Sequence, residues 1–297
     1  MAFVEGPAWH PSGNVYFTDI ANNRIMRRDP AGVMQVFRTP AGRANGLLFD
    51  QEGRLLACEG ADEGGNRRVT RTEPDGTITV LVDRFEGRRL NSPNDLTIDA
   101  QGRIYFTDPR YGPRDDLEQL DAEGEPIEGV YRIDPDGTIE RIVEHEVQRP
   151  NGIAVSPDGG HLFVVDNNNS RVDGNRKIWR FELSPEGRVV PGSRYEVHDF
   201  GQGRGGDGMA LDVEGRLYDT AGFNVPNLPL ENTDNPAGVY VFTPEGEQVA
   251  MIRVLEDMVT NCTFGGPDLK TLFITAGHKL WSIPVATPGH LVWPPAE

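Results

Sequence analysis

The sequence predicts an all-β fold, a six-bladed β-propeller with mostly four-stranded antiparallel blades around a central channel. The first observation is a hairpin pattern that occurs six times, with copies that begin 40 to 57 residues apart. The second is a Pro-x-Gly turn signal that follows the hairpin in five of the six units. Repeats of this length that contain several strands are typical of propellers. We therefore expect one domain over residues 1–297, although the length alone would allow two.

The hairpin of each unit consists of two apolar strands and a tight turn, as in "NGIAVSPDGGHLFVVD" (151–166). In all copies but the last, a glycine lies eight residues after the first residue, where the turn needs a residue that accepts positive φ. The six copies begin at Glu5, Asn45, Asn94, Asn151, Asp207 and Asn261.

A second hairpin turn is predicted within each of the first five units. The turns are "DPAG" (29–32), "EPDG" (73–76), "DPDG" (134–137), "SPEG" (184–187) and "TPEG" (243–246). Proline presets the turn and glycine completes it. "DPDG" lacks the twelve-residue ligand spacing of an EF-hand, so we interpret it as a turn and not as a calcium loop. The sixth unit lacks this signal, and we expect three strands there or closure by another segment.

The loops between the second and third strands of the blades should cover one end of the channel, the end at which the first strands begin. Long loops in compact domains are often functional. We expect 109–128 and 220–237, the longest, to roof a site, with short turns on the opposite face. The predicted loops are 20–23, 58–66, 109–128, 167–176, 220–237 and 276–278.

The first residue of every unit is a carboxylate or a carboxamide, although strands disfavour these residue types. One such residue is usually an Asx turn or a cap, but six of six indicate a ring of oxygen donors around the channel. Hard cations take oxygen ligands, and two carboxylates with amides suit calcium better than zinc. Manganese, magnesium and zinc remain alternatives. Asn45 and Asn261 either contact a substrate or space the ring by hydrogen bonds.

Composition excludes several function classes. The net charge of −17 argues against nucleic acid as a partner. No apolar run reaches the ~20 residues of a membrane helix, and the N-terminus lacks a signal pattern. We therefore expect a cytoplasmic protein, or one separated from its leader, with a small-molecule substrate and no indicated protein partner. Cys58 and Cys262 are expected to be buried thiols.

Other catalytic signatures are missing from the sequence. The six histidines show no metal-ligand spacing, and neither a G-x-S-x-G elbow nor a Walker loop occurs. "GQGRGG" (201–206) matches G-x-G-x-x-G, but a strand follows it where a dinucleotide site needs a helix. We interpret it as the segment that leads into Asp207, and "VVDNNNS" (164–170) as a loop at the rim.

The combined motifs "EGPAW", "SPNDL…GRIYFTDPRYG", "RPNGIAVSPDG", "GDGMALD" and "FGGPDLKTLFITA" resemble the regucalcin/gluconolactonase (senescence-marker-protein-like) family of six-bladed propellers. The resemblance covers nearly the whole chain. It implies a divalent metal, usually calcium, at the channel mouth and the hydrolysis of lactones such as gluconolactone. Carried over by position, it implies Glu5, Asn151 and Asp207 as metal ligands, with Asn94 beside the metal or the substrate.

One departure concerns the substrate. Some sugar lactonases of this family have an arginine two residues before the third-unit asparagine, where this chain has Ser92 and where Arg89 is the nearest replacement. We expect the metal to polarise the lactone carbonyl while Asp207, or a hydroxide held by the metal, provides the base. Asp108 is a further candidate base, with a turn-capping role as its alternative. Arg110 and Tyr111 begin the longest loop and are candidate substrate contacts.

Two other functions stay open at this point. The same site could hydrolyse aryl esters or phosphotriesters, because a Lewis acid assists any such displacement. A non-catalytic calcium-binding or protein-interaction propeller is the alternative outside enzymes. Carboxylates from two blades at one channel mouth favour a bound cation, because they repel one another without it. The long loops over the ring favour an enzyme over a calcium buffer.

Overall fold

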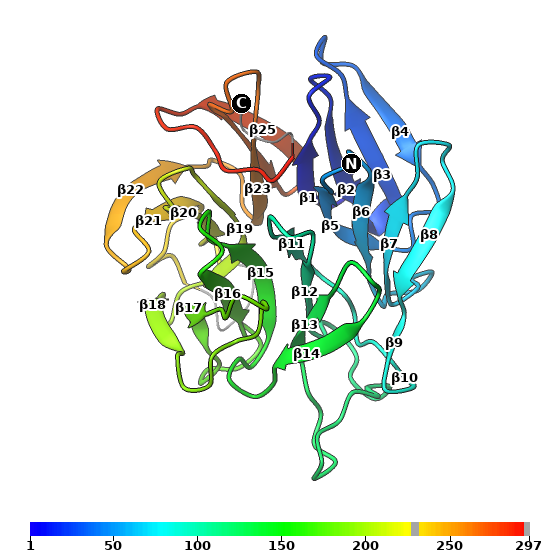
Figure 1. Cartoon of the computed structure of the whole chain (residues 1–297). Coiled ribbons are helices and arrows are strands. Elements are labelled where there is room, and N and C mark those ends of the chain that lie inside the picture. Colours follow the sequence, from blue (N-terminus) through cyan, green and yellow to red (C-terminus); the bar gives the residue numbers. More distant parts are fainter. Residues whose placement is uncertain (227–231, 294–297) are drawn as a thin grey trace.

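The computed structural model describes residues 1–226 and 232–293, which form six antiparallel sheets around a central channel (Figure 1). Five blades have four strands and the sixth has three, within the described residues. This confirms the predicted six-bladed propeller and the short sixth blade. In the part of the chain that the structure describes, no helix is long and apolar enough to cross a membrane.

The strands run from the channel outward in chain order. Blades one to three contain β1 (Val4–Trp9), β2 (Val15–Asp19), β3 (Arg24–Arg28), β4 (Met34–Arg38); β5 (Ala44–Phe49), β6 (Leu55–Glu59), β7 (Arg68–Thr72), β8 (Ile78–Val82); β11 (Leu96–Ile98), β12 (Ile104–Asp108), β13 (Gly129–Ile133), β14 (Ile139–Val143). Blades four to six contain β15 (Pro150–Val155), β16 (His161–Asn167), β17 (Arg176–Glu182), β18 (Tyr195–Asp199); β19 (Gly206–Leu211), β20 (Leu217–Ala221), β21 (Gly238–Phe242), β22 (Gln248–Arg253); β23 (Val259–Gly265), β24 (Thr271–Ala276), β25 (Lys279–Pro284). The 3₁₀ turn η1 (Ile20–Asn22) and the hairpin β9 (Arg84–Phe85) and β10 (Arg88–Arg89) are the remaining elements.

The turn positions behave as the glycine pattern predicts. The turn glycines of the first five inner hairpins have φ between 72° and 84°. In the sixth blade Leu269 occupies the equivalent position and also takes positive φ, 54°. The blade geometry therefore imposes this conformation even where glycine is missing, because the two strands must still be joined in the same register.

The loops between the second and third strands begin and end within two residues of their predicted bounds in all six blades. Their residues line the cavity at the channel mouth, from Ile20 in blade one to Phe223 in blade five. Part of the predicted loop 220–237, residues 227–231, lies outside the described residues.

The cores lie between neighbouring blades. In the interface of blades four and five, Phe163 and Ile178 pack against Met209, Leu217 and Phe242. Cys58 and Cys262 are both free and buried, as expected. Burial of large apolar side chains between sheets is the dominant stabilising contribution in such a fold.

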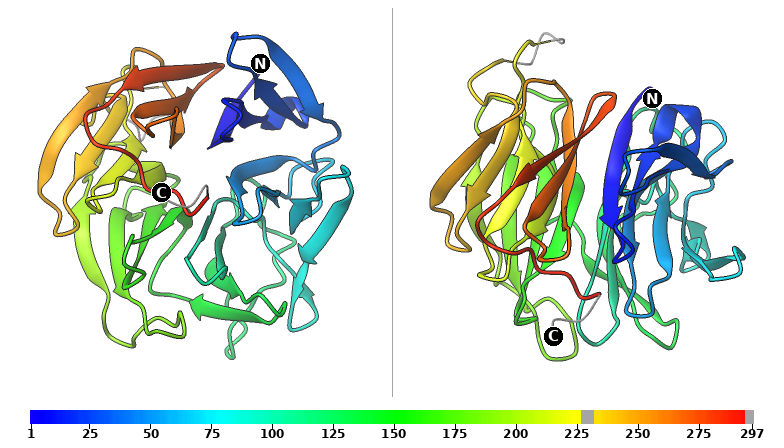
Figure 2. Two further views of the ribbon diagram at one scale, coloured as in Figure 1. Left: turned by 45° about the horizontal axis from the view of Figure 1, so that its top comes forward. Right: turned by 90° about the horizontal axis from the view of Figure 1, so that it is seen from above.

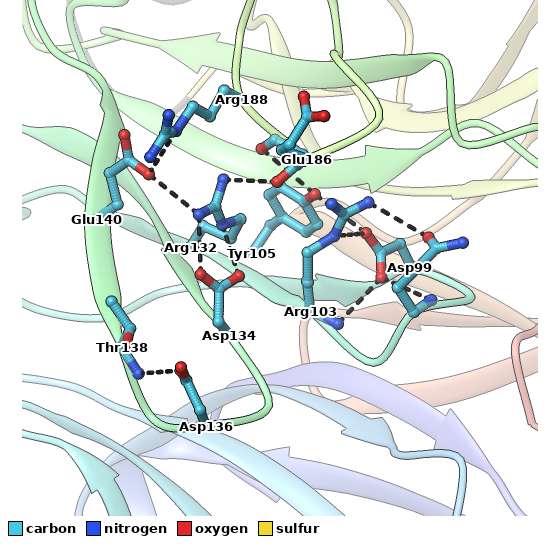
Figure 3. A network of polar contacts seen from close by, with 12 residues as sticks. Asp99, Arg103, Tyr105, Arg132, Asp134, Asp136, Thr138, Glu140, Glu186 and Arg188 are labelled. Carbon is cyan, nitrogen blue, oxygen red and sulfur yellow. Dashed lines mark hydrogen bonds and ion pairs between the residues drawn. The ribbon is translucent and has the colours of Figure 1, made fainter.

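A polar network joins blades three and four on the face opposite the channel mouth (Figure 3). Arg103 pairs with Asp99 at 2.6 Å and donates to the carbonyl of Pro185 in the next blade. Arg132 pairs with Asp134 at 2.8 Å and donates to the carbonyl of Glu186. These contacts tie the short turns of this face together.

The ring closes between blade six and blade one without a shared strand. The Val4 N–H donates to the Gly277 carbonyl at 3.0 Å, and the Thr260 hydroxyl donates to the Val4 carbonyl at 2.8 Å. After β25 the chain turns inward from blade six (Figure 2). It crosses the end of the channel opposite the mouth, where His290 N–H donates to Leu211 in blade five. Trp293 then packs against His10 and Phe49 of blades one and two, with ring centroids 5.0 and 5.6 Å away.

Candidate active site

The first residues of the six repeat units are here called the first-column residues; they are Glu5, Asn45, Asn94, Asn151, Asp207 and Asn261. They lie at β-bulges or just before the innermost strand of their blade. The pairing register shifts at this point in five of the inner hairpins, for example between Glu5 and Ala8 and between Pro150 and Ile153. In blade three Asn94 precedes β11 by two residues. Bulges turn side chains out of the sheet's regular alternation. They explain how a carboxylate or amide at a strand start can face the channel.

Glycine follows the first-column residue in four blades, and it lets the blades approach one another. A Cβ at Gly152 would lie 2.4 Å from the Asp207 carbonyl oxygen, and one at Gly208 would lie 2.1 Å from the Asn261 amide carbon. Real Cβ atoms do not come this close to other atoms. In these four blades the inner strand therefore packs directly against the next blade at its first-column residue, which fixes the spacing of this part of the ring.

Threonine hydroxyls add a second link between blades. Thr18 in blade one donates to the Asn45 carbonyl at 3.0 Å, and Thr107 in blade three donates to the Asn151 carbonyl at 2.8 Å. Both threonines come from the "YFTD" sequence of the second strand. These bonds hold the backbone of the next ring residue in place.

The ring opens into a cavity of about 460 Å³ at the channel mouth. This volume lies within the usual range of small-molecule pockets, about 300–1,000 Å³. Five of the six first-column residues line it: Glu5, Asn45, Asn94, Asn151 and Asp207. Asn261 lies deeper, facing the channel, where its amide donates to Asp95 at 3.1 Å.

The two carboxylates of the ring, Glu5 and Asp207, are buried, with 4% and 7% of their surface exposed. Burial and then the negative charges of Asp207 and Asp95 raise the pKa of Glu5 well above its ordinary value. Burial also raises the pKa of Asp207, and the Arg204 guanidinium opposes that rise. A cation bound between these two buried carboxylates would reduce their mutual repulsion.

Tyr111 reaches the ring from the longest loop. The Asn151 amide nitrogen donates to the Tyr111 hydroxyl oxygen at 2.8 Å. Because this nitrogen is engaged, the amide oxygen of Asn151 is the atom that could bind a cation or accept a hydrogen bond. The Tyr111 hydroxyl proton is left available for an oxygen in the cavity.

The donor set fits a hard cation. Glu5 and Asp207 contribute carboxylates, while Asn94 and Asn151 contribute amides on the same cavity wall. Within the described residues no group of three or more His, Cys, Asp or Glu side chains is placed to hold a metal. A metal here would therefore need amide oxygens, which calcium accepts more readily than zinc does.

Three predicted site residues, the candidate base Asp108 and the candidate substrate contacts Arg110 and Arg89, lie away from the cavity lining. Asp108 is buried and accepts the backbone N–H groups of Asn91 and Ser92, each at 2.7 Å, so its carboxylate caps the segment before Asn94. Arg110 is buried and pairs with Asp116 at 2.9 Å. Arg89 is exposed and pairs with Glu118. Each side chain is engaged by hydrogen-bond partners outside the cavity lining, and for Asp108 and Arg89 these partners come from other segments of the chain.

The cavity also contains residues that the sequence analysis did not select. Arg43 and Arg149 line it, and each lies two residues before its first-column asparagine. In the third unit this position is Ser92, which also lines the cavity. Comparison of this column across all six units would have found both arginines. Asn167 and Asn169, from the segment assigned to the rim, lie in the cavity wall as well.

Residues 3–278 match the protein family described as the SMP-30/Gluconolactonase/LRE-like region. The chain is 32% identical to a gluconolactonase from Zymomonas mobilis, over 97% of this chain and 80% of the relative. It is 27% identical to a pentonolactonase from Haloferax volcanii, over 91% of this chain and 80% of the relative. The structure of a gluconolactonase from Xanthomonas campestris superimposes with a TM-score of 0.77 at 30% identity, covering 96% of this chain and 86% of that one.

Proposed function

Because the chain belongs to the SMP-30/gluconolactonase/LRE-like family, we propose that it is a lactone hydrolase that opens sugar lactones and uses a divalent cation, with calcium as the first candidate. The observation that carries the proposal is the pair of buried carboxylates, Glu5 and Asp207, beside two amides at the mouth of a cavity of about 460 Å³. The names of the relatives, gluconolactonase and pentonolactonase, support the substrate class.

Glu5, Asn151 and Asp207 would hold the cation, with Asn94 beside it. Such a cation would polarise the lactone carbonyl and stabilise the negative charge that develops on its oxygen. The chain's own residues orient this site through the bulges, glycines and threonine bonds described above. The proposal places the lactone between the ring and the roofing loops.

Asp207 is the candidate base. Burial raises the pKa of its carboxyl group, which strengthens it as a proton acceptor, while Arg204 pairs with its Oδ2 atom and favours the ionised form. The ionised carboxylate would accept the proton of the attacking water. The Tyr111 hydroxyl, whose oxygen accepts from Asn151, would donate its proton to a lactone oxygen.

The test is proton release from glucono-1,5-lactone after chelation, followed by addition of calcium, manganese, magnesium or zinc. We expect activity to disappear with the chelator and to return with a divalent cation. Glu5→Gln and Asp207→Asn should each reduce kcat/KM by about 100-fold or more. Asp136→Asn, in an exposed turn on the opposite face, serves as the control. Full activity in the chelated wild-type protein would refute the metal-dependent mechanism.

A further inference from the structure

The cavity has a charge opposite to that of the whole protein. The chain carries a net charge of −17, yet four arginines and only three carboxylates line the cavity: Arg43, Arg149, Arg176 and Arg204, with Glu5, Asp62 and Asp207. A divalent cation at Glu5 and Asp207 would make the cavity more positive still. An excess of positive charge in a concave site attracts anions.

Three of these arginines form one wall of the cavity, here called the arginine wall (Arg149, Arg176 and Arg204). They come from the residue before β15, the start of β17 and the segment before β19, so the wall spans blades four and five. Blades six and one contribute the apolar side chains Phe3, Ile20 and Met258, while blade two contributes Arg43 and Asp62. The cavity therefore combines the arginine wall with a smaller apolar part of the lining.

Arg176 is a buried cation that forms no ion pair with any described residue. Only 3% of its surface is exposed. Its three guanidinium nitrogens donate to the Asn169 amide oxygen and to backbone carbonyls of residues 171–174, and none lies within ion-pair distance of a carboxylate. A buried charge without an opposite charge is costly, and an anionic ligand would remove that cost.

Arg149 is held in place with one nitrogen unused. Its Nε donates to Glu128 at 3.2 Å and its Nη1 to Ser170 at 2.9 Å, while the guanidinium lies 5.5 Å from the centre of the Tyr111 ring. Glu128 also pairs with Arg114 at 2.6 Å, so its single negative charge balances only one of the two positive charges of Arg149 and Arg114. Nη2 has no hydrogen-bond partner within the described residues. A preorganised guanidinium with a spare donor suits an oxyanion.

Arg204 completes the wall beside the ring. It donates from Nη1 to the Val259 carbonyl at 3.0 Å and from Nη2 to Asp207, and its face lies 5.2 Å from the centre of the Phe223 ring. Its Nε has no partner in the described part of the chain. Arg204 contacts Asp207, and Arg149 lies beside Tyr111, which contacts Asn151, so both arginines lie near ring residues of blades four and five.

We propose that the lactone taken by this site carries an anionic group, a phosphate, sulfonate or carboxylate, on the carbon chain away from the lactone carbonyl, and that the arginine wall binds this group. The inference rests on the proposed lactonase function and specifies its substrate class. The lactone carbonyl would lie at the ring, the anionic group against blades four and five, and the apolar face of the sugar against Phe3, Ile20 and Met258.

The experiment compares kcat/KM for glucono-1,5-lactone and its 6-phospho derivative at low ionic strength, with the divalent cation that supports activity. We expect the phosphorylated lactone to be preferred by at least about tenfold, as one charge-assisted hydrogen bond can supply. Arg149→Gln should reduce this preference by about tenfold or more, and added salt should reduce it as well. Arg188→Gln, an exposed arginine on the opposite face, should leave the preference unchanged. The 6-sulfo and 6-carboxylate lactones identify which oxyanion fits best.

Calorimetry with 6-phosphogluconate and gluconate gives a readout that does not depend on turnover. Tighter binding of the phosphorylated acid, lost in Arg149→Gln, is the expected result. Equal kcat/KM for the neutral and anionic lactones, with equal binding of the two acids, would overturn the inference and leave the lactonase intact. Hydrolysis of neither lactone with any cation would refute the proposed function, while preferential binding of the phosphorylated acid would still support the arginine wall.

Discussion

The spacing of the ring depends on Gly152, and replacing it with alanine tests the whole argument for the site. Gly152 follows Asn151 in β15, and a Cβ at this position would lie 2.4 Å from the Asp207 carbonyl oxygen and 2.9 Å from the Gly208 Cα. Contacts under 3.0 Å force a shift, so β19 must retreat by at least about 0.6 Å. Because both neighbours are backbone atoms, no side-chain rotation can relieve the overlap.

The shift separates Asn151 from Asp207, two proposed ligands of one cation. Overpacking of this kind should reduce the free energy of unfolding by about 1–3 kcal/mol. A displacement approaching 1 Å can lower activity by up to about 100-fold, so we expect kcat/KM to fall by about tenfold or more. The concentration of calcium that gives half-maximal activity should rise as well.

Gly160→Ala is the matched control because Gly160 lies in the same hairpin at the opposite end. Its Cβ would lie 3.4 Å from the nearest atom, an Asp158 carboxylate oxygen, which is an ordinary contact. This variant should be neutral or more stable by up to about 1 kcal/mol. Urea unfolding and lactone hydrolysis measure both effects. Unchanged kcat/KM and stability in Gly152→Ala would refute the role of close inter-blade packing in setting the ring.

Three further predictions concern other parts of the molecule. Calcium at about 100 times its Kd should raise the Tm by about 5 °C, and Glu5→Gln should abolish this rise; an equal shift in both proteins would contradict the ring as the metal site. Burial raises the pKa of Asp219, whose oxygens have no hydrogen-bond partner among the described residues. The folded protein therefore keeps this proton at a pH at which the unfolded chain has lost it, and folding becomes less favourable as the pH rises above about 4. Urea melts should show that the wild-type protein loses stability over this range relative to Asp219→Asn. Trp293→Ala should lower the free energy of unfolding by about 2 kcal/mol with little change in kcat, because Trp293 packs at the end of the channel opposite the site; a large loss of kcat with unchanged stability would contradict this role.

The sequence alone predicted the number of blades, the strand order and the loops that reach the mouth. These features follow from local chemistry, because a turn glycine and two apolar strands define a hairpin without help from the rest of the chain. The polar column could be aligned for the same reason, and five of its six members line the cavity. Even Leu269, the one exception to the turn glycines, takes the backbone conformation that its position in the repeat requires.

Only the tertiary structure decided which other side chains face the cavity. Asp108 and Arg110 seemed equal candidates to Tyr111, yet local partners hold the first two outside the lining while Tyr111 reaches Asn151. The arginine wall combines the segments before β15 and β19, at repeat positions that differ by one residue, with the start of β17, so no single repeat column contains it. The direction of a long charged side chain depends on the partners that folding brings near it, and sequence spacing does not record those partners. The repeat therefore determined the ring, and the packing of the blades and loops determined what surrounds it.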